Sequence, residues 1–153
     1  MAATGDAAYI KQINRSLILQ KIIEEKMISR AELSKVTALT RATISVQAAD
    51  LLDKELIVET QHEHYSVGRR PIMLSINRQA GYVLGIDLDY GAMTFALSDL
   101  LGKPITLETV PLTSSDYDYV MQTAAKNIVR FQSQCENSRY GLINVVIGVH
   151  GLV

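Results

Sequence analysis

The sequence predicts a mixed α+β protein in two parts, because its apolar residues change pattern about halfway along the chain. Residues 1–78 carry helical periodicities followed by two short strand-like runs. Residues 79–153 instead run strand, strand, strand, helix, strand. A length of 153 residues allows two small domains, and we therefore expect one at 1–78 and a second at 79–153.

The first expected element is an amphipathic helix from Lys11 to Lys26. Apolar residues recur in it at three- and four-residue steps, as a buried helix face requires. These residues are Ile13, Leu17, Ile18 and Ile22. Asn14 and Arg15 fall on the polar side, where they either contact a phosphate group or face water.

Between Ser29 and Asp53, two helices joined by a tight turn are expected. Ser29 and Thr40 are suitable N-cap residues, since a side-chain oxygen can accept a hydrogen bond from an otherwise unpaired backbone N–H. Glu32 lies three residues after Ser29, which completes a capping-box pattern. The first helix should end near Val36, and the second should run from Thr40 to about Asp53. Such a helix-turn-helix places its second helix in a DNA major groove.

The apolar residues of this segment match the needs of a small two-helix core. They are Leu33, Val36, Leu39, Ile44, Ala48 and Leu51. Arg41 stands at the start of the second helix and is expected to contact a base or a phosphate. Asp50 is expected at the rim of the DNA contact, because phosphates repel a carboxylate.

The outer face of the second helix carries mostly short side chains, which let a helix backbone approach base edges closely. Thr43, Ser45 and Gln47 can form hydrogen bonds with bases. Ala42 or Val46 can contact a thymine methyl group. The alternative is a plain helical hairpin whose outer face is solvated. The residues predicted here to bind DNA are Arg30, Thr40, Arg41, Ala42, Thr43, Ser45, Val46 and Gln47.

Two short strands are expected at 56–60 and 72–76, with a loop between them. Three helices followed by a two-stranded hairpin make a winged helix, in which this loop is the wing. The loop ends in Gly68, Arg69, Arg70 and Pro71, and arginines of this kind insert into a narrow minor groove. Gly68, Arg69 and Arg70 are therefore predicted to bind DNA, the alternative being a solvated loop with ordinary surface arginines.

Charge and metal-ligand content restrict the possible partners. Residues 1–78 hold 11 Lys and Arg against 9 Asp and Glu, whereas residues 79–153 hold 4 against 7. Specific DNA binding would therefore rely on contacts from individual, well-positioned side chains rather than on a generally basic surface. Cys135 is the only cysteine, which excludes an intrachain disulfide or a cysteine zinc cluster. His62 and His64 are expected to be exposed wing residues, because a closed zinc site needs four ligands, so no metal site is predicted.

Targeting signals are not evident in the sequence. No apolar run approaches the ~20 residues that a membrane-spanning helix needs. The opening residues, MAATGDAAYIKQ, lack the basic region and apolar core of a secretory signal. A cytoplasmic protein without a membrane partner is expected.

The second part predicts three strands at 82–87, 93–98 and 104–110, then a helix at 117–134 and a strand at 143–149. One face of the helix is apolar and consists of Val120, Ala124, Ile128 and Phe131. This order of elements resembles the opening of an actin-like, ribonuclease H-like α/β domain of the kind found in sugar kinases.

Taken in order, these segments resemble the repressor branch of the ROK family (repressors, open reading frames and sugar kinases), and within it the xylose-repressor type. The first part matches at Asn14-Arg15, SRAELS (29–34), RATIS (41–45) and GRRP (68–71). The second part matches at AGYVLGID (80–87), YGLI (140–143) and GVHGLV (148–153). The resemblance covers nearly the whole chain and implies a winged helix fused to the beginning of a sugar-sensing ROK domain.

The resemblance implies a repressor of sugar-utilisation genes, xylose genes foremost, that binds double-stranded DNA at a palindromic operator as a homodimer. A sugar effector bound by the full-length protein would relieve the repression. The alternatives are a sugar kinase-like or sugar-binding protein, and an oligomerisation or scaffold piece.

The chain departs from the family pattern in its DNA-binding motifs and in its phosphate loop. The turn between the two helices has Ala38 where the family has glycine, and the wing has Val67 in place of its first glycine. If position 38 needs a positive φ, alanine costs about 1 kcal/mol there. The kinases' Asp-x-Gly-Gly-Thr phosphate loop is replaced by Asp87-Leu88-Asp89-Tyr90-Gly91, and Asp89 would repel a phosphate. No ATP binding, catalytic residue or other cofactor is therefore predicted, and Asp87 is taken as a strand-end structural residue.

A third departure is that the sequence stops at Val153. In the family, the sugar-contacting residues, the kinases' catalytic Asp and a cysteine-rich zinc motif lie further along the chain. This chain alone is therefore expected to bind DNA weakly, to ignore sugar, and to self-associate through an open sheet edge.

Overall fold

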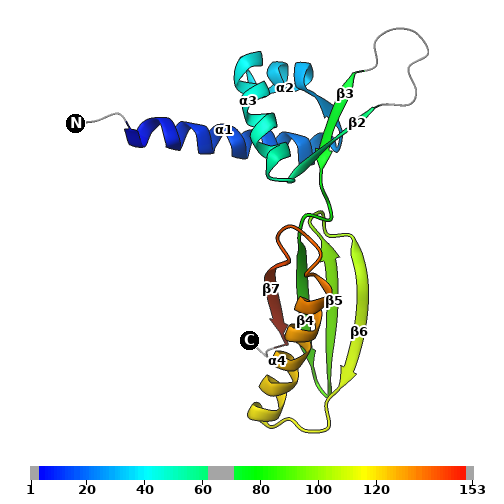
Figure 1. The fold of residues 1–153 in the computed structure, drawn as a ribbon. Coiled ribbons are helices and arrows are strands. Elements are labelled where there is room, and N and C mark those ends of the chain that lie inside the picture. The colour runs from blue at the N-terminus through cyan, green and yellow to red at the C-terminus, as the bar shows by residue number, and fades with distance from the viewer. Residues whose placement is uncertain (1–3, 62–70, 151–153) are drawn as a thin grey trace. The chain divides into compact units, whose positions relative to one another are not determined.

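A computed structural model describes residues 4–61 and 71–150 of the chain. The chain divides into two compact units, Met1–Asn77 and Arg78–Val153. Figure 1 shows helices and strands in both units, which confirms the predicted mixed α+β class. Among the described residues, no helix is long and apolar enough to cross a membrane.

The first unit consists of three helices and a three-stranded antiparallel sheet of order β1-β3-β2 (Figure 1). The helices are α1 (Thr4–Glu25), α2 (Arg30–Thr37) and α3 (Arg41–Asp53). The strands are β1 (Ile28–Ser29), β2 (Ile57–Gln61) and β3 (Ile72–Ile76). The predicted helix-turn-helix is α2–α3, and the wing strands β2 and β3 begin and end within one residue of the predicted positions.

Local capping interactions set the ends of α2 and α3. Ser29 caps α2 in a complete capping box: its hydroxyl accepts a hydrogen bond from the Glu32 N–H, and its own N–H donates to the Glu32 carboxylate. Ala38 ends α2 in the left-handed region, at φ 56° and ψ 14°. Position 38 therefore does need a positive φ, and alanine carries the steric strain that glycine would avoid.

The core of the first unit joins all three helices to the sheet. Its buried residues are Ile18, Ile22, Ile28, Leu33, Ile44, Ala48, Leu51, Ile57 and Leu74. Two residues predicted to be buried are not: Ile13 is 48% exposed and Val36 is 51% exposed. Both lie on helix faces turned away from this core, so an apolar residue at helical spacing was not sufficient to predict burial at either position.

The second unit is a four-stranded sheet of order β6-β5-β4-β7 with one helix, and every element matches a predicted one within two residues. The elements are β4 (Tyr82–Asp89), β5 (Ala92–Asp99), β6 (Pro104–Pro111), α4 (Tyr117–Gln134) and β7 (Leu142–Val149). β4, β5 and β6 pair antiparallel, and α4 crosses over one face of the sheet so that β7 pairs parallel to β4 (Figure 1).

The predicted apolar face of α4 packs on that sheet. Ala124 and Phe131 are buried, and the Phe131 ring stacks on Phe95 of β5 with centroids 5.7 Å apart. Val120 and Ile128 are partly buried against the same cluster. The second unit therefore has its own core, separate from that of the first.

Candidate nucleic-acid interface

The predicted recognition helix, α3, begins with a hydroxyl cap. Thr40 adopts an extended conformation, and its Oγ1 accepts a hydrogen bond from the Thr43 N–H at 3.1 Å. The two threonine hydroxyl oxygens also lie 2.9 Å apart. The Thr43 hydroxyl predicted to face a base is therefore half-buried and already bonded within the cap.

The exposed face of α3 carries mostly short side chains. Arg41, Ala42, Ser45 and Val46 are all exposed, and the Val46 side chain stands 61% exposed to solvent. Ala42 and Val46 lie one turn apart and opposite the buried residue Ile44, and Ser45 and Arg41 lie to one side of them. A helix surface of this kind can approach a base-pair edge without steric obstruction.

Gln47 does not belong to this exposed face, and its predicted placement there is wrong. It is only 5% exposed, and its Oε1 has no hydrogen-bond partner among the described residues. Gln47 is three residues after Ile44 and four before Leu51, so the helical period turns it toward the buried side. Because glutamine is polar, the sequence predicted a surface position, but the packing of the unit buries this side chain.

Arg30, also predicted to bind DNA, is held by an ion pair within the unit. Its Nη2 lies 2.6 Å from Oε1 of Glu59, so the first residue of α2 is tied to β2. The pair is partly exposed, at 33% and 37% for the two side chains. The arginine is therefore positioned relative to the wing strand.

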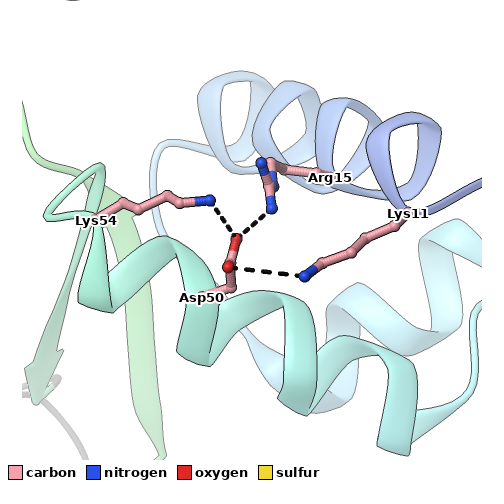
Figure 2. Close-up of polar contacts among 4 residues, drawn as sticks. All are labelled: Lys11, Arg15, Asp50 and Lys54. Carbon is pink, nitrogen blue, oxygen red and sulfur yellow. Dashed lines mark hydrogen bonds and ion pairs between the residues drawn. The ribbon is translucent and has the colours of Figure 1, made fainter. Parts of the chain in front are cut away.

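Asp50, on one flank of α3, is the centre of a group of charges that the sequence interpretation did not identify. Figure 2 shows three cationic side chains around its carboxylate. Lys54 Nζ donates to Oδ2 at 3.0 Å, Arg15 Nη2 donates to the same oxygen, and Lys11 Nζ lies 3.9 Å from Oδ1. The hydrogen bond from Lys54, with the charges of Arg15 and Lys11, holds the pKa of Asp50 below its usual value.

Arg15 therefore neither faces open water nor lies free for a phosphate, the two options its sequence position left. Its side chain is 28% exposed, and it joins α1 to α3 through Asp50. The spacing of Asp50 and Lys54, at i and i+4, was a signal visible in the sequence. The contribution from α1 was not, because Arg15 is 35 residues away from Asp50.

The wing predictions lie outside the described residues. These are Gly68, Arg69 and Arg70, and also His62 and His64. Within 4–61 and 71–150, no three His, Cys, Asp or Glu side chains gather as metal ligands would.

The second unit contains a pocket of about 460 Å³ at the end of β4. Its lining includes Asp89 at the end of β4, Tyr90 and Gly91 of the β4–β5 turn, Val149 and His150. Asp89 Oδ1 accepts a hydrogen bond from the Tyr90 N–H at 2.7 Å, so the carboxylate is folded onto the turn itself. Asp87, nearby, is 59% exposed, with Oδ1 3.9 Å from Nδ1 of His150. Carboxylates at this position oppose the binding of a phosphate.

The comparisons with known proteins find relatives across nearly the whole chain. The xylose repressor of Bacillus spizizenii is 35% identical over 149 residues, which are 97% of this chain and 39% of that protein. The xylose repressor of Bacillus subtilis is 34% identical over the same shares. The N-acetylglucosamine repressor of Escherichia coli is 24% identical over 99% of this chain and 37% of its own length. No protein-family model matches the chain.

One solved structure agrees in fold as well as in sequence. It is the crystal structure of a ROK family transcriptional regulator, described as a homologue of the E. coli MLC protein. It superposes with a TM-score of 0.69 at 31% identity, over 94% of this chain and 37% of that chain. The chain thus spans about two-fifths of the length of the relatives that it matches.

Proposed function

The chain belongs to the ROK family of transcriptional regulators, as a homologue of the N-terminal part of its xylose repressors, and we propose that its first unit binds operator DNA. The matched relatives are transcriptional repressors rather than enzymes. The observation that carries the proposal is the capped helix α3, whose exposed face consists of Arg41, Ala42, Ser45 and Val46. The short side chains of Ala42, Ser45 and Val46, in the first two turns of α3, leave room for the helix backbone to enter a major groove.

Operator binding is tested best by placing a negative charge on that face. Val46→Glu should weaken binding of an A·T-rich palindromic duplex by tenfold or more, because a carboxylate in the groove meets phosphates and base acceptors. Ile23→Glu is the matched control, since Ile23 is 50% exposed on α1 and is not part of the α3 face. Fluorescence anisotropy of a labelled duplex measures both variants. Equal binding by Val46→Glu and the unsubstituted chain would contradict the proposal.

The wing arginines remain part of this proposal. Replacing Arg69 and Arg70 by alanine should lower both the affinity and the preference for A·T-rich flanks, because arginine reads a narrow minor groove by its potential. An unchanged flank preference would remove the wing from the interface. The exposed residues Arg41, Ala42, Ser45 and Val46 of α3 would then be the remaining candidates for base contact.

We further propose a homodimer on a palindromic operator, released by a sugar. One recognition helix reads about half a site, and a two-fold dimer matches two half-sites separated by about one helical turn, ~34 Å. The relatives' names favour xylose, with N-acetylglucosamine as a second candidate. The test uses the native full-length gene product with operator DNA and millimolar xylose, glucose or N-acetylglucosamine. Release by none of the three would refute the sugar class proposed here.

The kinase alternative has a specific observation against it. Asp89, the last residue of β4, stands where the phosphate loop of a kinase has a glycine. An assay of ATP hydrolysis with the same sugars tests this alternative. Turnover above a no-protein blank would favour it over the repressor.

A further inference from the structure

The two units join at the peptide bond between Asn77 and Arg78. Domain boundaries ordinarily fall in exposed, flexible linkers. At this junction, however, each of the two residues is held by a backbone hydrogen bond and by a side-chain contact, and each is held by its own unit. The junction therefore differs from a flexible linker, and its contacts identify what each side of it is attached to.

Asn77 is attached to the end of the predicted recognition helix. Its N–H donates to the Leu56 carbonyl at 3.0 Å, and its Nδ2 donates to the Glu55 carbonyl at 2.8 Å. The Glu55 N–H in turn donates to the Leu52 carbonyl of α3 at 2.9 Å. The Leu56 N–H donates to the Leu51 carbonyl at 3.0 Å. With Glu55 left-handed at φ 56°, these two bonds form the Schellman motif that ends many helices, so Asn77 binds the C-terminal cap of α3.

Arg78 is attached to the sheet of the second unit. Its carbonyl oxygen accepts a hydrogen bond from the Leu100 N–H at 3.2 Å, and its Nε lies 2.8 Å from Oδ2 of Asp99. The Asp99 side chain is only 8% exposed. Its Oδ1 accepts hydrogen bonds from the Leu101 and Lys103 N–H groups, both at 2.9 Å. The carboxylate at the end of β5 therefore holds both the β5–β6 turn and the junction.

We propose that the peptide between Asn77 and Arg78 is a pivot through which the second unit controls the recognition helix, with these two residues as positioning residues. The proposal rests on the proposed function and adds the route of its regulation. Because each residue has two contacts to its own unit, rotation between the units is confined to the few backbone torsions at the junction. A movement of the end of β5 would reach the cap of α3 directly, because no residue separates the two attachments.

The first test compares operator binding with and without sugar in the native full-length gene product. Sugar-dependent release is a coupling between two sites, and such couplings typically change affinity by about 5–150-fold. Asn77→Ala with Arg78→Gln removes both side-chain attachments, so the change in affinity caused by millimolar sugar should fall to about twofold or less. A purely structural role of the two residues would lower stability and leave this ratio as it is. Fluorescence anisotropy of a labelled operator measures the ratio.

Two control variants isolate the junction from general effects of substitution. Asn127→Ala removes an equivalent bond, from Nδ2 to the Thr123 carbonyl at 2.9 Å within α4, and should leave the ratio unchanged. Arg78→Lys keeps a positive charge beside Asp99 and should retain most of the ratio. Circular dichroism of each variant reports the fold.

A second measurement on the 153-residue chain needs neither DNA nor sugar. The backbone amides of residues 77 and 78 should have NMR order parameters of about 0.85, the value of rigid backbone, whereas a flexible linker has values below about 0.6. Asn77→Ala with Arg78→Gln should lower both order parameters. Values below about 0.6 in the unsubstituted chain would show that the junction is not held, and the pivot would be wrong.

The outcomes distinguish this inference from the proposed function. If the full-length protein binds no operator, the proposed function fails, and regulation through the junction fails with it. If it binds and the sugar releases the folded double variant as fully as the unsubstituted protein, the pivot is wrong and operator binding stands. If no sugar changes the affinity, operator binding again stands and the pivot is wrong. An equal loss of release in Asn127→Ala would assign the effect to general destabilisation and would also overturn the pivot.

Discussion

Gln47 offers the sharpest test of how the first unit is packed. The residue is 5% exposed on α3, and its Oε1 has no partner among the described residues. A buried polar group left unpaired costs about 1–3 kcal/mol, whereas an apolar group of the same shape avoids that cost. Gln47→Met keeps the unbranched shape and nearly the volume, so we expect the unfolding free energy of the first unit to rise by about 1 kcal/mol.

A gain of that size is measurable. For a unit of 77 residues it corresponds to a rise in melting temperature of about 4–8 °C. Thermal unfolding followed at 222 nm suits this unit, because α1, α2 and α3 contribute 22, 8 and 13 helical residues. Gln47→Glu is the opposite control, since it buries a charge and should destabilise by several kcal/mol.

The same substitution also tests function. A buried Gln47 makes no base contact, so Gln47→Met should bind operator DNA as the unsubstituted chain does, within about twofold to threefold. A loss of about 1–3 kcal/mol confined to one base pair, without a gain in stability, would show that Gln47 reads a base. The buried placement would then be refuted.

Three further predictions concern stability. Ala38→Gly should raise the unfolding free energy by up to about 1 kcal/mol in a urea titration, because glycine relieves the left-handed strain at φ 56° but loses more entropy on folding. Phe131→Ala should cost about 3–5 kcal/mol in the same assay, since it leaves a cavity against Phe95. Burial raises the pKa of Asp99, but hydrogen bonds from the Lys103 and Leu101 N–H groups and the Arg78 guanidinium outweigh it and hold the pKa below its ordinary value. The ionised Asp99 carboxylate therefore stabilises the folded state above its unfolded-state pKa of about 3.9, and this stabilisation is lost as the pH falls below that value. Asp99→Asn should make the unfolding free energy depend less on pH in acid, as measured by urea titrations at several pH values.

Local structure could be predicted from the sequence wherever it depends on residues only a few positions apart. Ser29 and Thr40 were recognised as N-caps, and both cap α2 and α3 as expected. The bounds of α4 also agree with expectation. Capping and helical periodicity depend on neighbours three or four residues away, which the sequence displays directly.

The predicted DNA contacts differ in how far the structure bears on them. Ala42, Ser45 and Val46 are exposed, and they stay predictions until binding is measured. Gln47 was misplaced because a polar residue next to a buried face is assigned by its chemistry, whereas its burial depends on how closely the surrounding elements pack.

The sequence by itself predicted the four helices and six of the seven strands of the described residues, and the N-caps of α2 and α3, because these depend on local pattern. Only the tertiary structure decided which residues those elements bury and which charges they bring together. Strand β1 exists because Ile28 and Ser29 pair with Leu74 and Met73, some 45 residues along the chain. Asp50 gains Arg15 as a partner across 35 residues, because α1 packs beside α3. Contacts between distant segments are stabilised by packing in three dimensions, and no spacing along the chain records them.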